Sequence, residues 1–209
     1  KANNRTIGGP NGSNPFYLLN LMPRSLDVTQ FRNSVDANGN MIWYGTGSGI
    51  NPYWGYQYNL NEDERDRIMM NGSLKYEIAS WLTGQINAGA DIYTNNSNAR
   101  TYSGSPLTPT GRYSLGKNTF TETNFQALFI AKKDDLFGKF GGMATLGGNL
   151  MDRQSSSISG SAGQLVVPNL FALNNAVGNP TVGEGYSQKA INSVFGSAQL
   201  NYDGYLYLD

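Results

Sequence analysis

The chain has 209 residues, of which 39% are hydrophobic, 12% aromatic and only 14% charged, and its 15 basic residues balance 15 acidic ones. It contains no cysteine and no histidine, which excludes disulfides, Cys/His zinc sites and any catalytic triad with an imidazole base. The balanced charge creates no field that would attract nucleic acid, and the aromatic content argues against a disordered chain. No run reaches the roughly 18 apolar residues of a transmembrane helix.

Residues 1–60 show no sustained hydrophobic period, and we expect a region of loops and short elements there. Asn14-Pro15 opens a short helical piece from Phe16 to Met22. Asp36–Asn40 contains an Asn-Gly pair between two apolar runs, Phe31–Val35 and Met41–Tyr44, and this pattern predicts a β-hairpin.

From Arg67 the sequence alternates strictly between two kinds of residue. The first kind is apolar or small, namely Ile68, Met70, Gly72, Leu74, Tyr76 and Ile78, and the second is mostly polar, namely Met69, Asn71, Ser73, Lys75 and Glu77. After a tight turn at Ala79-Ser80 the alternation resumes and continues to Tyr93. A period of two residues predicts strands with one apolar and one polar face.

The same pattern recurs further along the chain. We expect a third strand at about 118–132, a short turn over 133–139, a fourth strand at about 140–151, a fifth at 190–202 and a sixth from Tyr205. The segments 61–94, 118–151 and 190–209 are thus predicted barrel strands. Two long polar segments, 95–117 and 152–189, are predicted extracellular loops.

The connections alternate between short and long, as in bacterial outer-membrane barrels with short periplasmic turns and long outer loops. The strands are also longer than the 5–6 residues typical of soluble sheets and the roughly 9–11 needed to cross a bilayer. We therefore predict an all-β fold, an antiparallel transmembrane β-barrel segment. A soluble antiparallel sandwich, whose strands also alternate, is the alternative.

Three motifs suggest chemistry but have simpler interpretations. Gly111–Asn118 almost matches a phosphate-binding loop, yet Asn118 replaces the required Ser or Thr and a strand follows instead of a helix. Asp36, Asn38 and Asn40 have the opening spacing of a calcium loop without its later residues. The run Glu62–Arg67 could hold calcium, although such runs are more often solvated and self-paired. With no acid/base pair evident, we predict no catalytic residue, no enzyme and no resident metal or cofactor.

The densest aromatic stretch of the chain lies between residues 43 and 58. The candidate ligand-binding residues are Trp43, Tyr53, Trp54 and Tyr56, whose ring faces could stack on sugar rings or on peptide side chains. The alternative is that these rings pack the loops down or join an interfacial aromatic girdle.

Two segments of the sequence carry a resemblance to a known family. Asn51-Pro52-Tyr53-Trp54, followed by Asn59–Ile68 with its Arg65-Asp66-Arg67, resembles the SusC/RagA-type TonB-dependent transporters of Bacteroidetes. The strand–turn–strand from Gly72 to Leu82 and the segment Asn192–Asp209 look like the same family. The resemblance covers residues 51–94 and 190–209 best.

The resemblance implies a plugged barrel of about 22 strands in the bacterial outer membrane, of which this chain would supply about six. It further implies import of oligosaccharides or oligopeptides, energy from the TonB complex acting through a plug region, and a SusD-like surface lipoprotein over the extracellular mouth. The plug and the C-terminal strands have no match in the chain, so we expect a piece of a longer protein. Six strands with open edges would leave backbone groups unpaired in lipid.

Two other functions remain open at this stage. One is a passive outer-membrane barrel or surface adhesin with the same strand pattern, and the other is a soluble β-sandwich that binds carbohydrate. The substrate cannot be chosen from the sequence, because loop shape would set it.

Overall fold

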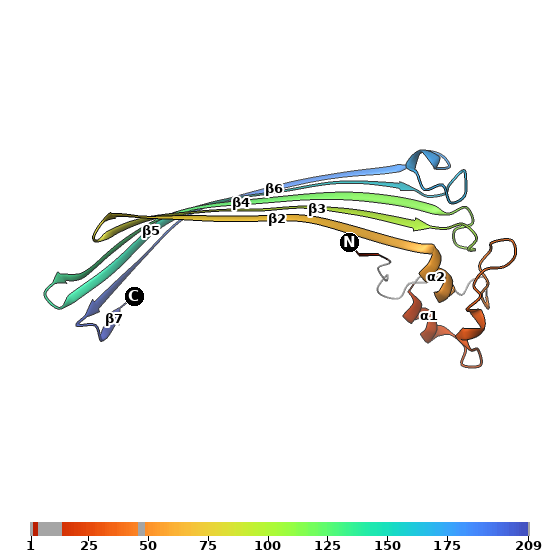
Figure 1. Ribbon diagram of the computed structural model, residues 1–209, viewed down its shortest axis with the longest axis horizontal. Coiled ribbons are helices and arrows are strands. Elements are labelled where there is room, and N and C mark those ends of the chain that lie inside the picture. Colours follow the sequence, from red (N-terminus) through yellow and green to blue (C-terminus); the bar gives the residue numbers. More distant parts are fainter. Residues whose placement is uncertain (1, 4–13, 46–48, 209) are drawn as a thin grey trace. The chain divides into compact units, whose positions relative to one another are not determined.

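The computed structural model describes residues 2–3, 14–45 and 49–208 (Figure 1). Its elements are β1 (Ala2–Asn3), α1 (Pro15–Leu21), the 3₁₀ helix η1 (Val28–Phe31), α2 (Pro52–Tyr58), β2 (Asn59–Ala79), β3 (Leu82–Thr101), β4 (Arg112–Phe137), β5 (Phe140–Ala162), the 3₁₀ helix η2 (Leu173–Asn175), β6 (Thr181–Tyr202) and β7 (Leu206–Leu208). None of the helices in these described ranges is long and apolar enough to cross a membrane.

Within the described residues, seven strands form one sheet in the order β1 to β7, so that each strand pairs with its neighbour in the sequence. Pairing is antiparallel where the register is given: Ala2 lies opposite Asp63 at one edge, and Leu200 lies opposite Leu208 at the other. The predicted all-β antiparallel fold is confirmed. The alternating sequence explains it, because a two-residue period matches the pleat of a strand and no competing helical period occurs.

The chain divides into two compact units, which are described separately below. Unit 1 comprises residues 1–66, 94–118 and 157–185, and unit 2 comprises residues 67–93, 119–156 and 186–209.

The strands are longer than the alternation predicts. The segment 95–117 contains the end of β3 and the start of β4, which leaves a connection of residues 102–111. The segment 152–189 likewise contains the end of β5 and the start of β6, leaving residues 163–180. The reason lies in the composition: within Ser155–Ser161 one face carries only serines and the other carries Ser156, Ile158 and Gly160, so a single large apolar side chain marks the strand. The short turn predicted over 133–139 is also smaller, because β4 continues to Phe137 and Gly138 makes the turn with φ +64°.

The region before β2 holds both a confirmed and a corrected prediction. Helix α1 lies where the Asn-Pro signal predicts it, and the Asn14 side chain caps it by accepting the Phe16 N–H at 3.0 Å. The predicted hairpin is reduced to a single bridge between Val35 and Met41, because residues 28–31 form η1 instead of a strand. Helix α2 is an element that the sequence pattern did not predict.

The well-buried hydrophobic side chains among the described residues all belong to unit 1, namely Leu18, Ile50, Trp54, Ala162 and Leu165. Unit 2 instead exposes large apolar side chains along its strands. Leu74, for example, is 67% exposed and Tyr76 is 70% exposed. The sheet of unit 2 therefore has an apolar surface that no part of the described chain covers.

Candidate functional site

The polar positions of unit 2 form a hydrogen-bonded row of side chains, which we call the amide ladder (Ser73, Gln85, Asn87 and Gln126). The Ser73 hydroxyl donates to Asn87 Oδ1 at 2.7 Å, and the Asn87 amide donates to Gln126 Oε1 at 2.9 Å. Gln85 Nε2 donates to the same Asn87 oxygen at 3.0 Å. The ladder thus crosses β2, β3 and β4, because alternate residues of neighbouring strands share one face. A shallow hollow of about 460 Å³ lies here, lined in addition by Asn71, Asn124 and Asn149.

Unit 2 also carries four charged side chains on successive strands, which we call the charged row (Arg67, Asp91, Glu122 and Arg153). Arg67 donates two hydrogen bonds to Asp91, from Nε to Oδ1 at 2.8 Å and from a terminal nitrogen to Oδ2 at 2.6 Å. Arg153 contacts a single oxygen of Glu122, Oε2, with Nε at 2.8 Å and a terminal nitrogen at 2.6 Å. Asn124 donates to Oε1 of that carboxylate at 3.0 Å. From β2 to β5 the signs run plus, minus, minus, plus, so the row has no net charge.

The arginines of the charged row are more exposed than their partners. Each guanidinium side chain is 47% exposed, against 27% for Asp91 and 22% for Glu122. Phe120 contacts the row through its ring, which stacks on Tyr93 with centroids 4.8 Å apart and has its centroid 5.6 Å from the Arg153 guanidinium carbon. The row therefore offers ordered hydrogen-bond donors to solvent, with the carboxylates set further back.

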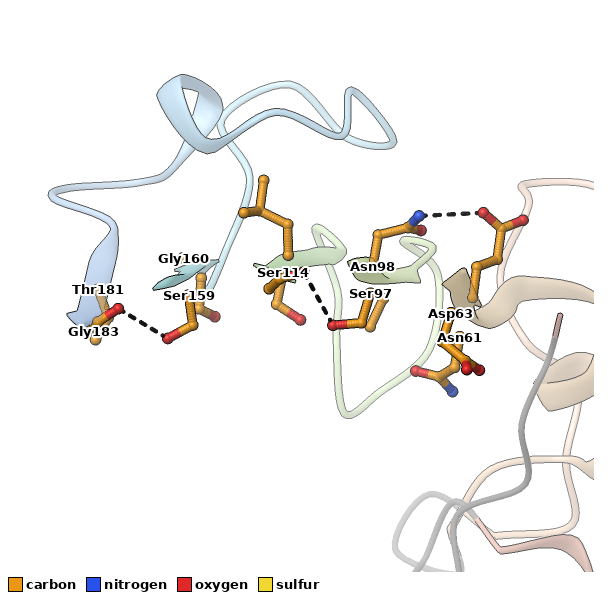
Figure 2. Close-up of a pocket in the computed structure, with 14 residues that line it drawn as sticks. Asn61, Asp63, Ser97, Asn98, Ser114, Ser159, Gly160, Thr181 and Gly183 are labelled. Carbon is orange, nitrogen blue, oxygen red and sulfur yellow. Dashed lines mark hydrogen bonds between the residues drawn. The ribbon is translucent and has the colours of Figure 1, made fainter. Parts of the chain in front are cut away.

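Unit 1 contains an open groove of about 620 Å³ with a floor of small residues (Figure 2). Its lining comes from β2 to β6 and includes Asn61, Asp63, Ser97, Asn98, Ser114, Ser159, Ser161 and Thr181. Figure 2 shows the Ser97 hydroxyl directed at the next strand, where it donates to the Gly116 carbonyl at 3.4 Å. A Cβ at Gly116 would come within 3.0 Å of that hydroxyl, so glycine keeps the floor flat. Hydroxyl and amide groups of this kind can hydrogen-bond to a sugar or to a peptide backbone.

The acidic run that begins at Glu62 does not gather its carboxylates in one place. Glu62 pairs with Arg100 at 2.7 Å and accepts from Asn98 at 3.3 Å. Consecutive residues of an extended strand point to opposite faces, which separates the members of the run. Among the described residues, no group of three or more metal-ligating side chains occurs. Calcium binding at 62–67 stays a prediction that nothing in the structure tests.

The calcium-like spacing at residues 36–40 forms a turn. Asp36 Oδ1 accepts the backbone N–H groups of Asn38 and Asn40, both at 2.8 Å. The N–H of Asn40 is the main reason that the pKa of the Asp36 carboxyl lies below its ordinary value. Similarly, the phosphate-loop lookalike leads into β4 at Arg112 and opens no helix.

The four aromatic candidates occupy different environments in unit 1. Trp54 is 1% exposed and packs on Tyr58 with ring centroids 4.3 Å apart, so it takes the packing role that the alternative describes. Trp43 is partly buried, 4.9 Å from the Phe31 ring and 4.8 Å from the Tyr44 ring. Tyr53 lies 6.0 Å from the Arg32 guanidinium carbon, and Tyr56 is 75% exposed. Tyr56 therefore presents the most open ring of the four, and ligand binding by these residues remains a prediction.

Asn51 is the important residue that pattern analysis missed. It is fully buried, its Nδ2 donates to the carbonyl oxygens of Phe31 at 2.9 Å and Ile42 at 2.8 Å, and its Oδ1 caps α2 by accepting the Tyr53 N–H at 2.9 Å. An Asn before a Pro is a helix-start signal that could have revealed this cap.

Comparisons with known proteins place this geometry in context. No protein-family model matches the sequence, and no curated protein matches it. Solved structures do match. A structure of the RagAB peptide transporter has a TM-score of 0.71 at 18% identity over 83% of this chain, and the RagAB peptide importer in its closed-closed state gives the same values. The open-open state of that importer gives a TM-score of 0.68 at 19% identity. The chain spans about 20% of the length of these proteins, and at this identity the likeness shows that it shares the fold of a part of them.

Proposed function

We propose that the chain is a wall segment of an outer-membrane importer that takes up oligopeptides or oligosaccharides with energy from the TonB complex. The observation that carries the proposal is the two-faced sheet of unit 2, where exposed apolar side chains such as Leu74 alternate with the amide ladder. A membrane-spanning strand needs an apolar face toward lipid and tolerates a polar face only toward water or protein. The fold likeness to parts of peptide transporters supports this assignment.

In this proposal the polar face of unit 2 lines the water-filled interior. Amide and hydroxyl groups there can exchange hydrogen bonds with water and with a passing substrate without holding it tightly. The charged row adds fixed donors of zero net charge, so it would not repel either sign of substrate. The groove of unit 1 (Figure 2) and the exposed Tyr56 supply further contacts for substrate.

We also propose partners for the complete protein. A SusD-like surface lipoprotein would contact the 163–180 loop, where Val166, Val167 and Leu170 are all more than half exposed. TonB would act through a plug region supplied by another part of the protein.

The membrane assignment is tested by a pair of neighbouring substitutions. Leu74→Arg places a charge on the face proposed to meet lipid, which costs about 2–4 kcal/mol near the bilayer midplane. Ser73→Arg places the same charge on the proposed interior face. We expect the Leu74 variant to be depleted from the outer membrane and the Ser73 variant to reach it at nearly normal levels, as measured by membrane fractionation. Equal levels of both variants, or wild-type protein found in the aqueous fraction, would exclude the proposal.

The transport assignment needs a separate experiment. Cells that lack the gene are compared with wild type for growth on a panel of oligopeptides and oligosaccharides, with and without TonB. We expect a growth defect on at least one substrate that TonB removal reproduces. Uptake that does not depend on TonB would favour a passive barrel, and an unchanged growth profile together with lost surface attachment would favour an adhesin.

A further inference from the structure

Three segments of unit 1 contact one another in series. They are α2 with the residues before it, the connection 102–111, which we call the bridging loop, and the connection 163–180, which we call the distal loop (Figure 1). The bridging loop makes hydrogen bonds and ring contacts with each of the other two segments.

The bridging loop is attached to the α2 side by backbone and ring contacts. The Tyr102 N–H donates to the Tyr58 carbonyl at 3.0 Å, and the Met41 N–H donates to the Gly104 carbonyl at 2.8 Å. The Tyr58 and Tyr102 rings meet edge to face with centroids 5.5 Å apart. Gly104 has φ +106°, and a Cβ there would overlap the Gly39 carbonyl oxygen and lie 3.0 Å from the Trp54 ring. The bridging loop therefore has no room for a side chain at residue 104, where it faces Gly39 and Trp54.

The bridging loop is attached equally closely to the distal loop. Asn169, itself at φ +65°, accepts the Ser103 N–H on its Oδ1 at 2.8 Å. The Phe171 ring packs edge-on against Tyr102 with centroids 4.9 Å apart. Leu165 is fully buried, and a Cβ on Gly111 would touch it at 3.4 Å. Tyr102 thus contacts both Tyr58 and Phe171.

The distal loop is internally fixed, so that a displacement at its tip would reach these contacts. Asn175 is 7% exposed; its Nδ2 donates to the carbonyls of Val167 at 2.8 Å and Leu170 at 2.7 Å, and its Oδ1 accepts the Val167 N–H at 3.0 Å. A bridge between Leu165 and Ala176 closes its base. These contacts join the distal loop into one cooperative unit.

We propose that Tyr102 mechanically couples the distal loop to helix α2, so that an event at either segment changes the order of the other. A partner or substrate that contacts Val166, Val167 or Leu170 would thereby alter the helix that carries Tyr53 and Tyr56. Packed side chains connect the two segments at each step, and chains of packed side chains can carry energetic coupling between distant sites. It does not depend on the transport function proposed above.

Hydrogen–deuterium exchange on the full-length protein, purified in detergent, tests the coupling. In Phe171→Ala the distal loop loses its close ring contact with Tyr102 and a more distant one with Tyr113, whose centroid is 6.2 Å away. We expect the peptide covering 53–58 to exchange about 2- to 10-fold faster, the range of the closer aromatic pair. Leu170→Ala is the matched control: the neighbouring side chain is 54% exposed, and its removal should leave the 53–58 peptide unchanged.

A second variant guards against simple misfolding of the first. Asn169→Gly keeps the positive φ accessible and removes only the bond to Ser103, and it should also speed exchange at 53–58. The proposal is overturned if Phe171→Ala or Asn169→Gly speeds exchange in 163–180 alone. It is equally overturned if Leu170→Ala speeds exchange at 53–58 as much as Phe171→Ala does.

Discussion

Asn51 should be one of the most costly polar residues to remove from unit 1. Asn51→Ala deletes the α2 cap, which is worth about 1 kcal/mol. It also deletes both bonds donated to the Phe31 and Ile42 carbonyls, at about 1 kcal/mol each for partly buried acceptors. The sum is about 3 kcal/mol of local stability, which corresponds to about a hundredfold increase in the open fraction of the segment.

The chain offers a matched control for this substitution. Asn14 also precedes a proline and also caps a helix, with its Oδ1 accepting N–H groups of Phe16 at 3.0 Å and Tyr17 at 3.4 Å. Asn14→Ala deletes a cap worth about 1 kcal/mol, which corresponds to about a fivefold opening of α1. Asn51→Asp should cost at least as much as Asn51→Ala at neutral pH, because it keeps the capping oxygen but places a buried carboxylate against the Phe31 and Ile42 carbonyl oxygens.

Amide exchange measures these effects segment by segment, read from peptides covering 53–58 for Asn51 and 16–22 for Asn14. The reasoning fails if Asn51→Ala opens α2 no more than Asn14→Ala opens α1. That result would mean that the two long-range bonds contribute nothing beyond the cap.

Three further predictions concern the loops and the charged row. Gly104→Ala should destabilise the bridging loop by about 2–3 kcal/mol in denaturant unfolding. Gly178→Ala is the control: its φ of +87° is similar, but an added Cβ would meet no atom within 4 Å, so it should cost only the backbone strain of about 1 kcal/mol. Equal losses would contradict the packing at Gly104. The pKa of Asp36 is lowered in the folded chain, so its carboxylate stabilises the turn fully above the unfolded-state pKa of about 3.9 and loses this effect as the pH falls through the lower folded-state pKa. Hydrogen exchange of a 33–44 peptide, corrected for intrinsic rates, should show this loss in wild type and not in Asp36→Asn. A double-mutant cycle with Arg67→Met and Asp91→Asn should give a coupling energy of no more than about 1 kcal/mol, because both side chains are partly exposed to solvent. A value above about 2 kcal/mol would show that solvent screens the pair less than its exposure indicates.

The faces of the strands could be predicted from the sequence because they depend only on local periodicity. Ile68 to Ile78 and their polar neighbours alternate without interruption, and β2 and β3 follow that pattern. The ends of β3 and β5 could not be predicted in the same way, since polar residues occupy both faces at the end of β3 and small residues dominate the end of β5. Helix α2 was missed for a different reason: seven residues are too few to show a helical period, and only the Asn51-Pro52 cap marks its start.

The charged row illustrates what a single sequence cannot reveal. The two ion pairs of the charged row join residues that are far apart in the sequence: 24 residues separate Arg67 from Asp91, and 31 separate Glu122 from Arg153. Whether these side chains come into contact depends on the register between neighbouring strands. Register is set by turn geometry and by the pairing of whole strands, so charges at these positions look scattered in the sequence. The aromatic candidates show the same limit, because Trp54 and Tyr56 are two residues apart and yet one is buried and the other exposed.

The distal loop has one more property that follows from its composition. Residues 163–180 include no acidic and no basic side chain, while aliphatic groups such as Val166 and Leu170 project from it. Contacts made by uncharged apolar groups are not weakened by dissolved salt, whereas salt weakens interactions of exposed arginines, with a screening length of about 10 Å at 0.1 M and about 3 Å at 1 M ionic strength. A partner bound through the distal loop should therefore remain bound in concentrated salt, whereas a ligand bound through the charged row should dissociate.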